Sequence, residues 1–483
     1  MTYQRYFSCI IAFVIGIISV SDVDSLYAQQ NSSDNDTEYQ FASSVYGSTD
    51  ENLPFWFYSN VHGKVDPSSN NWLNEISVNH ELWNTDKLRI NIGGEAVFRL
   101  SDNSTALFPK AYLRANAYGL QLDAGRFSQP IGLNNHDLSV GSMMVSPNAM
   151  PVPKISISTP TFMDVPFTSG HVQYKGMFSH GWLEKDRFVS NAYLHQKYFY
   201  LRINIGPWSG TGGIVHNVQW GDTHPSLGKL PQSFGDFLRV VTGRAASESS
   251  NAPGSDITNV IGNSLAAYEF GLRYEHEVFT ASLTRLFYLE DKVSTRFRSP
   301  WDGVWGANII FKDNERLISG ITYEHVNTKQ MDSKEWELIG AADYYDNGIY
   351  NHGWTYENDV MGIPLILFEN DDIANNVLVA HHLGLKGQLM KNVNYKTFIT
   401  YSRNYGTQDD WVENPGNNIP KDRPDITPRE QFRQDQYSWL VSLHYDFARY
   451  ENLAANVKIS SDFGELYDRR LGIMIGLTWR NAF

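Results

Sequence analysis

The chain has almost no cysteine. Its 483 residues contain one, Cys9, which lies in an apolar run near the N-terminus. Beyond that position disulfides, thiolate metal sites and cysteine nucleophiles are excluded. The 14 histidines show no HxxxH or HExxH spacing, and no GxSxG motif occurs. No spacing singles out a pair of carboxylates for catalysis. We therefore expect no metal site, no cofactor and no enzymatic activity.

Basic charge and long apolar runs are also scarce. Lys and Arg together number 39 against 53 Asp and Glu, which gives a net charge of −14. An acidic chain without a basic stripe is a poor candidate for binding nucleic acid. The mean hydropathy is −0.38, and no stretch after residue 20 is long and apolar enough to predict a membrane-spanning helix.

The first residues have the pattern of an export signal. Residues 7–20 are apolar, and Leu26-Tyr27-Ala28 offers a cleavage site before Gln29. This pattern predicts a secretory signal peptide over residues 1–28. Residues 29–52 are polar and poor in aliphatic side chains, so we expect a flexible periplasmic lead there.

From about residue 53 the dominant signal is strict alternation of apolar and polar residues. In residues 88–100, apolar side chains share one parity, while Arg89, Glu95 and Arg99 occupy the other. A strand sends alternate side chains to opposite faces, so one face is lipid-like and the other charged. The same alternation recurs at 110–117, 198–205, 268–275 and 437–447.

A soluble sandwich would also alternate, but three features favour a transmembrane antiparallel β-barrel over residues 53–483. The segments run to about 8–13 residues, longer than the usual strand. Aromatic residues make up 14% of the chain and recur near strand ends. The polar faces carry charges of both signs, which suits a hydrated or networked lumen.

The C-terminus predicts the location. Ile473, Ile475, Leu477, Trp479 and the final Phe483 share one parity. An alternating strand that ends on an aromatic residue resembles the signal read by the barrel assembly machinery of the outer membrane. We therefore expect outer-membrane localisation, with outer-membrane lipid and that machinery as partners.

Two features bear on the lumen. Five prolines fall within residues 147–166, and proline cannot donate to a central ladder, so we expect an external loop or a stretch folded into the lumen. The opposite charges of Arg89, Glu95 and Arg99 are expected to pair across a narrow lumen. Together these features predict an occluded lumen. Residues 245–263 and 404–431 are predicted to be long external loops.

The motif YNHGWTY (350–356) combines rings with amide and imidazole groups. Sugars stack on aromatic rings while polar groups take their hydroxyls. The candidate saccharide-binding residues are Tyr350, Asn351, His352, Trp354 and Tyr356, with Trp411 as an outlying candidate. The alternative is that the motif forms a structural turn or plugs the lumen.

Three segments resemble the capsule assembly protein Wzi family: residues 120–158, 174–203 and 344–367. The resemblance implies an outer-membrane barrel of about 18 strands with a lectin-like role, which holds capsular or other surface polysaccharide at the cell surface. About 25 residues per strand and connection would fit that number. The alternative function is a porin for small solutes or oligosaccharides, because GRFSQPIGL (125–133) resembles a strand-to-loop corner of many porins.

Overall fold

The structure is a computed structural model of the chain. It describes residues 37–247, 252–290, 295, 297, 299–331, 342–407 and 433–481. These residues belong to one compact unit. The predicted signal peptide (1–28) and the first part of the predicted lead (29–36) lie outside the described residues. In the described part, no helix is both long and apolar enough to cross a membrane.

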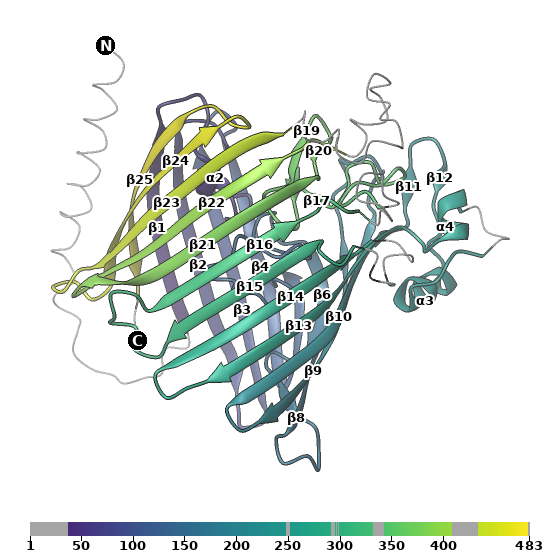
Figure 1. Ribbon diagram of the computed structural model, residues 1–483, viewed down its shortest axis with the longest axis horizontal. Coiled ribbons are helices and arrows are strands. Elements are labelled where there is room, and N and C mark those ends of the chain that lie inside the picture. The colour runs from purple at the N-terminus through teal and green to yellow at the C-terminus, as the bar shows by residue number, and fades with distance from the viewer. Residues whose placement is uncertain are drawn as a thin grey trace, which may run out of the picture. The chain divides into compact units, whose positions relative to one another are not determined.

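The unit is built around one closed antiparallel sheet (Figure 1). The sheet has 19 strands, and the two-residue β7 pairs with β8 alone, which leaves the predicted 18 in the wall. The wall strands are β1 (Thr37–Ser48), β2 (Asn71–Asn84), β3 (Leu88–Leu100), β4 (Thr105–Ala117), β5 (Leu120–Arg126), β6 (Pro153–Ser158), β8 (Val172–Trp182), β9 (Tyr193–Ile205), β10 (Trp208–Trp220), β13 (Asn263–Glu275), β14 (Phe279–Leu289), β15 (Gly303–Phe311), β16 (Gly320–Asn327), β21 (Leu378–Met390), β22 (Val393–Asn404), β23 (Gln434–Asp446), β24 (Leu453–Gly464) and β25 (Arg470–Arg480).

Smaller elements lie in the connections between the wall strands. They are β7 (Met163–Asp164), β11 (Thr223–His224), β12 (Gly228–Lys229), β17 (Thr355–Tyr356), β18 (Asp359–Val360), β19 (Leu367–Glu369), β20 (Asp372–Asn375), α2 (Phe55–Tyr58), α3 (Phe234–Thr242) and α4 (Gly254–Thr258).

The first and last wall strands close the barrel. β1 pairs with β2 on one side and with β25 on the other, in a register that runs from Gln40↔Arg480 to Ser48↔Gly472. Each wall strand therefore has two neighbours, and the sheet has no open edge. Closure of this kind satisfies the backbone N–H and C=O groups that lipid cannot hydrogen-bond.

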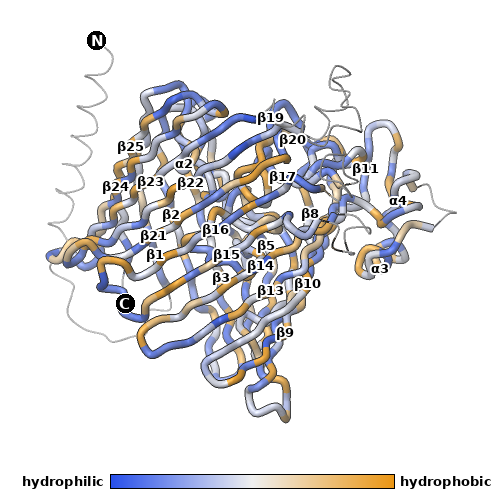
Figure 2. Tube along the Cα trace, in the orientation of Figure 1, coloured by the Kyte–Doolittle hydropathy of each residue, from blue (hydrophilic) through white to orange (hydrophobic). Residues whose placement is uncertain are grey.

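The wall sorts its side chains as the alternation predicts. In β3, Ile92, Phe98 and Leu100 are 47–53% exposed on the outside, whereas Glu95 on the other parity is 6% exposed. The same alternation of apolar and polar residues follows the strands around the wall (Figure 2). The outer surface is thus apolar, as a lipid-facing surface must be.

Aromatic rings gather near one rim of the outer wall. Tyr401, Tyr437 and Phe463 lie side by side on β22, β23 and β24. Their ring centroids are 4.8 Å and 5.0 Å apart in succession, and the rings are stacked. Such a row is typical of the girdle that marks the boundary between lipid and water.

The two ends of the barrel differ. At one end, called here the short-turn end, the connections include the two-residue turns 118–119, 206–207 and 391–392. β1 begins and β25 finishes at this end. The opposite end, the long-loop end, carries the connections 127–152 and 328–377, among others. Short turns face the periplasm and long loops face outward in barrels of this kind.

The predicted start of the barrel is wrong. β1 occupies Thr37–Ser48, inside the range 29–52 that was expected to be a flexible lead. Its outward face carries Tyr39 and Phe41, but Ser43 and Gly47 occupy later outward positions where the alternation would place apolar residues. The weak alternation concealed a strand that pairing with both β2 and β25 stabilises.

The proline-rich segment is partly a wall strand, contrary to expectation. Pro153 opens β6, which pairs with β5 and β8. Proline is tolerated at the first residue of a strand because its missing N–H then leaves the ladder intact. Residues 147–152, together with 127–146 before them, fold inward, which is one of the two alternatives predicted for the proline-rich segment.

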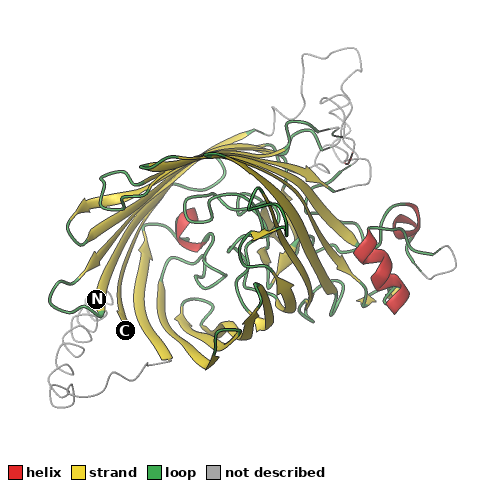
Figure 3. Ribbon diagram, turned by 90° about the horizontal axis from the view of Figure 1, so that it is seen from below, coloured by secondary structure: helices red, strands yellow, loops and turns green. Residues whose placement is uncertain are grey.

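Three connections from the long-loop end pack inside the ring of strands: 49–70, 127–152 and 342–377, the last being the described part of its loop (Figure 3). They share one apolar core with inward-facing wall residues. Its members include Phe55 and Phe57 of α2, Met143 and Met144, Tyr345 and Trp354, and Leu73 and Val97 of the wall. The barrel thus has a packed interior at the level of these loops.

Ion pairs join the inward loops to the wall. Lys64 of the first loop binds Glu75 of β2 and lies 3.1 Å from Glu95 of β3. Glu95 also accepts from Lys110 of β4 at 2.6 Å. The predicted pairing of Arg89, Glu95 and Arg99 across the lumen is not what these contacts show, because Glu95 pairs with lysines of the first loop and of the neighbouring strand β4.

Closure can be tested with engineered cysteines. Ala42 of β1 lies opposite Thr478 of β25, and Thr478 lies opposite Ala454 of β24. With Cys9→Ser as background, Ala42→Cys/Thr478→Cys should form a disulfide on oxidation, because paired strands place Cα atoms about 5 Å apart.

The control is Ala42→Cys/Ala454→Cys, whose positions are two strands or about 10 Å apart, too far for a disulfide. Gel mobility of the unreduced, denatured protein reports the bridge. Bridging in the control pair, or its lack in the test pair, would contradict the closing register.

Candidate functional site

The motif 350–356 lies in the connection between β16 and β21, at the long-loop end. Tyr350, Trp354 and Tyr356 are 1%, 0% and 2% exposed. The Trp354 indole Nε1 donates to the Met144 carbonyl at 2.8 Å, and Arg126 donates to the Tyr356 hydroxyl at 2.8 Å. In this conformation the three rings are buried in the apolar core and offer no face to a saccharide.

Tyr345 explains why the chain takes this path. Its hydroxyl donates to the Met143 carbonyl at 2.6 Å and accepts from the Ile363 N–H at 3.0 Å. Gly353 has φ +58°, and a Cβ there would lie 2.3 Å from the Tyr345 carbonyl oxygen. A Cβ at Gly362 would meet the Tyr345 hydroxyl. The two glycines let the loop wrap closely around one buried tyrosine.

The other two predicted residues are accessible. Asn351 is exposed, and the side chain of His352 is 12% exposed. His352 accepts from the Phe188 N–H at 3.1 Å through Nδ1, and its Nε2 lies 3.7 Å from the Asp371 carboxylate. His352 therefore links the 183–192 loop to the hairpin formed by β19 and β20.

Rings gather around His352 at the surface. The Phe368 ring stands edge-on to His352 at 5.6 Å between centroids, and Phe188 meets His224 at 5.1 Å. Phe188 is 36% exposed, and the Asp371 side chain is 82% exposed. We call these five residues the rim cluster: Phe188, His224, His352, Phe368 and Asp371.

A buried arginine fixes the loops beneath the rim cluster. Arg187 donates to the carbonyls of Thr355 at 3.0 Å and Gly353 at 3.3 Å, and it lies 3.3 Å from Glu184. Burial lowers the pKa of Arg187 and raises the pKa of Glu184. The attraction between the two charges opposes both shifts. Burial, helped by the nearby Arg187 charge, also lowers the pKa of His352. A neutral His352 leaves Nδ1 free to accept from Phe188.

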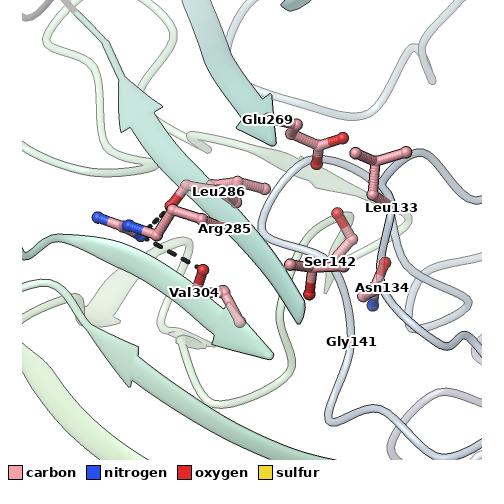
Figure 4. A pocket seen from close by; sticks show the side chains of 9 residues that line it. Leu133, Asn134, Gly141, Ser142, Glu269, Arg285, Leu286 and Val304 are labelled. Atoms are coloured by element: carbon pink, nitrogen blue, oxygen red, sulfur yellow. Dashed lines mark hydrogen bonds between the residues drawn. The ribbon is translucent and has the colours of Figure 1, made fainter. Parts of the chain in front are cut away.

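The described interior contains small cavities. A cavity between the inward loop and the wall is lined by Leu133, Asn134 and Ser142 on one side and by Glu269 of β13, with Arg285 turned away from it (Figure 4). It has room for water-sized molecules only. Among the described residues, no group of His, Cys, Asp or Glu is arranged to hold a metal ion.

Sequence reasoning missed Phe188, Phe368 and Arg187, because single residues in loops carry no periodic signal. Trp411, the outlying candidate, lies outside the described residues. The segment 174–203, quoted for its family resemblance, contains Phe188 and Arg187 and was the available pointer to this loop.

Burial predicts different roles for neighbours in the motif. Trp354→Ala should destabilise the packed interior by about 3–5 kcal/mol, because it leaves a large cavity and an unpaired Met144 carbonyl. Asn351→Ala, three residues away and exposed, should leave stability within about 0.5 kcal/mol of the parent. Thermal unfolding and limited proteolysis in detergent measure both. Equal stability of the two variants would contradict the buried placement of Trp354.

The capsule assembly protein Wzi family matches residues 24–460. No curated protein matches the chain in sequence. Among solved structures, Wzi of Escherichia coli, described as an outer membrane protein involved in group 1 capsule assembly and a carbohydrate-binding β-barrel, is 15% identical, with a TM-score of 0.56 over 91% of this chain and 83% of that one.

Two barrels of Pseudomonas aeruginosa are less similar. OpdO is 8% identical, with a TM-score of 0.47 over 92% of this chain and 97% of its own, and OpdL is 7% identical, with a TM-score of 0.46 over 93% and 99%. The match to the family model extends over most of the sequence, from before the first strand into β24. The chain belongs to the capsule assembly protein Wzi family and is an outer-membrane β-barrel.

Proposed function

We propose that this barrel binds capsular or other surface polysaccharide and retains it at the cell surface through its long-loop end. Membership of the capsule assembly family carries the proposal. Wzi of Escherichia coli, which shares the fold, is described as carbohydrate-binding. The rim cluster and neighbouring Asn351 support it, because the exposed ring of Phe188 lies near imidazole, amide and carboxylate groups, which is what sugar recognition needs.

Within this proposal the motif residues divide by exposure. Asn351 and His352 contact saccharide hydroxyls, and the exposed ring of Phe188 stacks on a sugar face. Tyr350, Trp354 and Tyr356 hold the loop in place from below. One such site binds a sugar weakly, so retention depends on several sites engaging one polymer.

We propose binding without catalysis. A glycosidase needs a general acid whose pKa is raised by desolvation, set at a fixed distance from a second carboxylate. The Asp371 side chain is 82% exposed, and its recorded contact is with His352. This carboxylate suits a sugar hydroxyl better than a proton-transfer role.

The test replaces accessible residues and leaves the buried ones alone. Phe188→Ala/Asn351→Ala should weaken binding of purified polysaccharide, since loss of one stacked ring costs about 1 kcal/mol, or about fivefold in affinity. Cell-bound polysaccharide should fall while total polysaccharide is unchanged. The matched control is Phe167→Ala, a fully exposed phenylalanine in the 159–171 connection at the short-turn end.

If the double variant assembles normally and retains polysaccharide like the parent, the rim cluster is not the site. If deletion of the whole gene leaves surface polysaccharide unchanged but slows solute uptake, the porin alternative takes its place.

The proposal also includes a lumen that does not conduct freely. The packed loops 49–70, 127–152 and 342–377 support this, as do the ion pairs of Glu95. Planar-bilayer recording of the purified protein should show no large, steady open-state current. A stable conductance of porin size would favour the alternative function, passage of small solutes. In the same recordings, the variant Trp354→Ala should show transient openings more often than the parent.

A further inference from the structure

One connection from the long-loop end folds outward rather than inward. Residues 221–262 link β10 to β13, and their described part carries the β11–β12 hairpin, α3 and α4. Both helices lie outside the ring of strands (Figure 3). Phe237 of α3 contacts Phe178, His195 and Trp220, which lie on β8, β9 and β10. We call residues 221–262 the outer-wall loop.

The loop covers polar side chains on a face that otherwise meets lipid. Lys197 shares its parity with Phe199 and Leu201, which are 48% and 46% exposed. Lys197 donates to His216 Nδ1 at 2.6 Å, and His216 Nε2 lies 2.9 Å from the Ser264 hydroxyl. This chain of contacts crosses three adjacent strands on the outside of the wall.

Polar groups in that position need shielding from hydrocarbon, which offers them no hydrogen bonds. α3 and its C-terminal turn provide the shield. Phe237 packs over His180 and His195. Gly243 ends the helix in a left-handed conformation, and a Cβ built on it would lie 3.8 Å from the His216 ring. The side chain of Val240 is buried with Val218 and Trp220 of β10.

α3 has a second apolar side that nothing in the described structure covers. Successive helix residues lie about 100° apart, so Phe234 and Leu238 share an edge next to the partly buried Phe237 and the buried Val240. Phe234 is 75% exposed and Leu238 is 49% exposed. Asp236 and Arg239 lie on the opposite side, and Gly235 lies between Leu238 and Arg239. The helix thus has one side on the wall, one apolar edge and one polar side.

The depth of α3 fits a position at the membrane surface. Phe237 reaches Phe178, four residues below the rim end of β8 at Trp182. Four residues of a tilted strand span about 10 Å, and interfacial helices bury their apolar faces about 5–10 Å into the boundary between headgroups and acyl chains. Phe234 on the exposed edge contacts Phe237, and Phe237 contacts Phe178 on the outer face of β8.

We propose that α3 is an interfacial anchor: the Phe234–Leu238 edge inserts into the outer leaflet of the membrane, and the outer-wall loop seals the Lys197–His216–Ser264 contacts from lipid. The occupant of the exposed edge is the acyl region of the lipid. The anchor fixes one side of the long-loop end relative to the membrane surface, independently of any saccharide.

Neighbouring residues of α3 provide a matched test. Phe234→Cys and Gly235→Cys, each in a Cys9→Ser background, are labelled with an environment-sensitive fluorophore, and the purified protein is reconstituted in phosphatidylcholine vesicles. A Cβ at Gly235 meets only ordinary contact with Ser233, so the control variant is tolerated. Leu201→Cys, on the lipid-facing wall, serves as the lipid-exposed standard.

With nitroxide-labelled lipid in the vesicles, quenching at position 234 should approach that at position 201 and exceed that at position 235 at least twofold. Leu238→Cys should behave like Phe234→Cys, which guards against a local effect of one label. Equal quenching at positions 234 and 235, with both labels accessible to a water-soluble quencher, would overturn the proposal. Because the protein is pure, a protein partner cannot produce the expected result.

Discussion

The structure depends on a wall that is one strand thick and meets a different environment on each side. Lipid on the outside requires apolar side chains and a fully paired backbone, which closure between β1 and β25 provides. The inside must then be filled or hydrated. Here the loops 49–70, 127–152 and 342–377 share an apolar core with inward-facing wall residues, while Lys64, Glu95 and Lys110 join loop to wall.

The same constraint explains why the inward loops and the outer-wall loop have different roles. Inward loops hold each other in place through buried contacts, such as those of Tyr345, Trp354 and Arg187, and they leave a polar rim facing outward. The outer-wall loop does the reverse, because it covers polar groups where they would meet lipid. For the proposed function, rigid loops at the rim would lower the entropy cost of holding a flexible polymer.

Sequence reasoning predicted the wall well, because a strand between lipid and lumen must alternate. The alternation predicted β3, β9 and β23. It did not predict β1, because Ser43 and Gly47 interrupt the apolar face of that strand. It did not predict β6, because Pro153 was taken to exclude a strand. Loop burial was beyond prediction: YNHGWTY has the composition of a sugar site, and its rings are buried only through contacts with distant residues such as Met144. α3 left a usable signal in the capping box of Ser233 and Asp236.

Closure also sets the order in which the molecule can be completed. Wall strands pair with their neighbours along the chain, with one exception: β1 and β25, where Gln40 meets Arg480, 440 positions later. Local hairpins can form early, but bringing ends so far apart together carries the largest loop-closure entropy. The edge of β1 therefore stays open until the last strand has been made and exported. A chain that ends before residue 470 would lack β25, so its wall would keep two unpaired edges even if every other strand were in place.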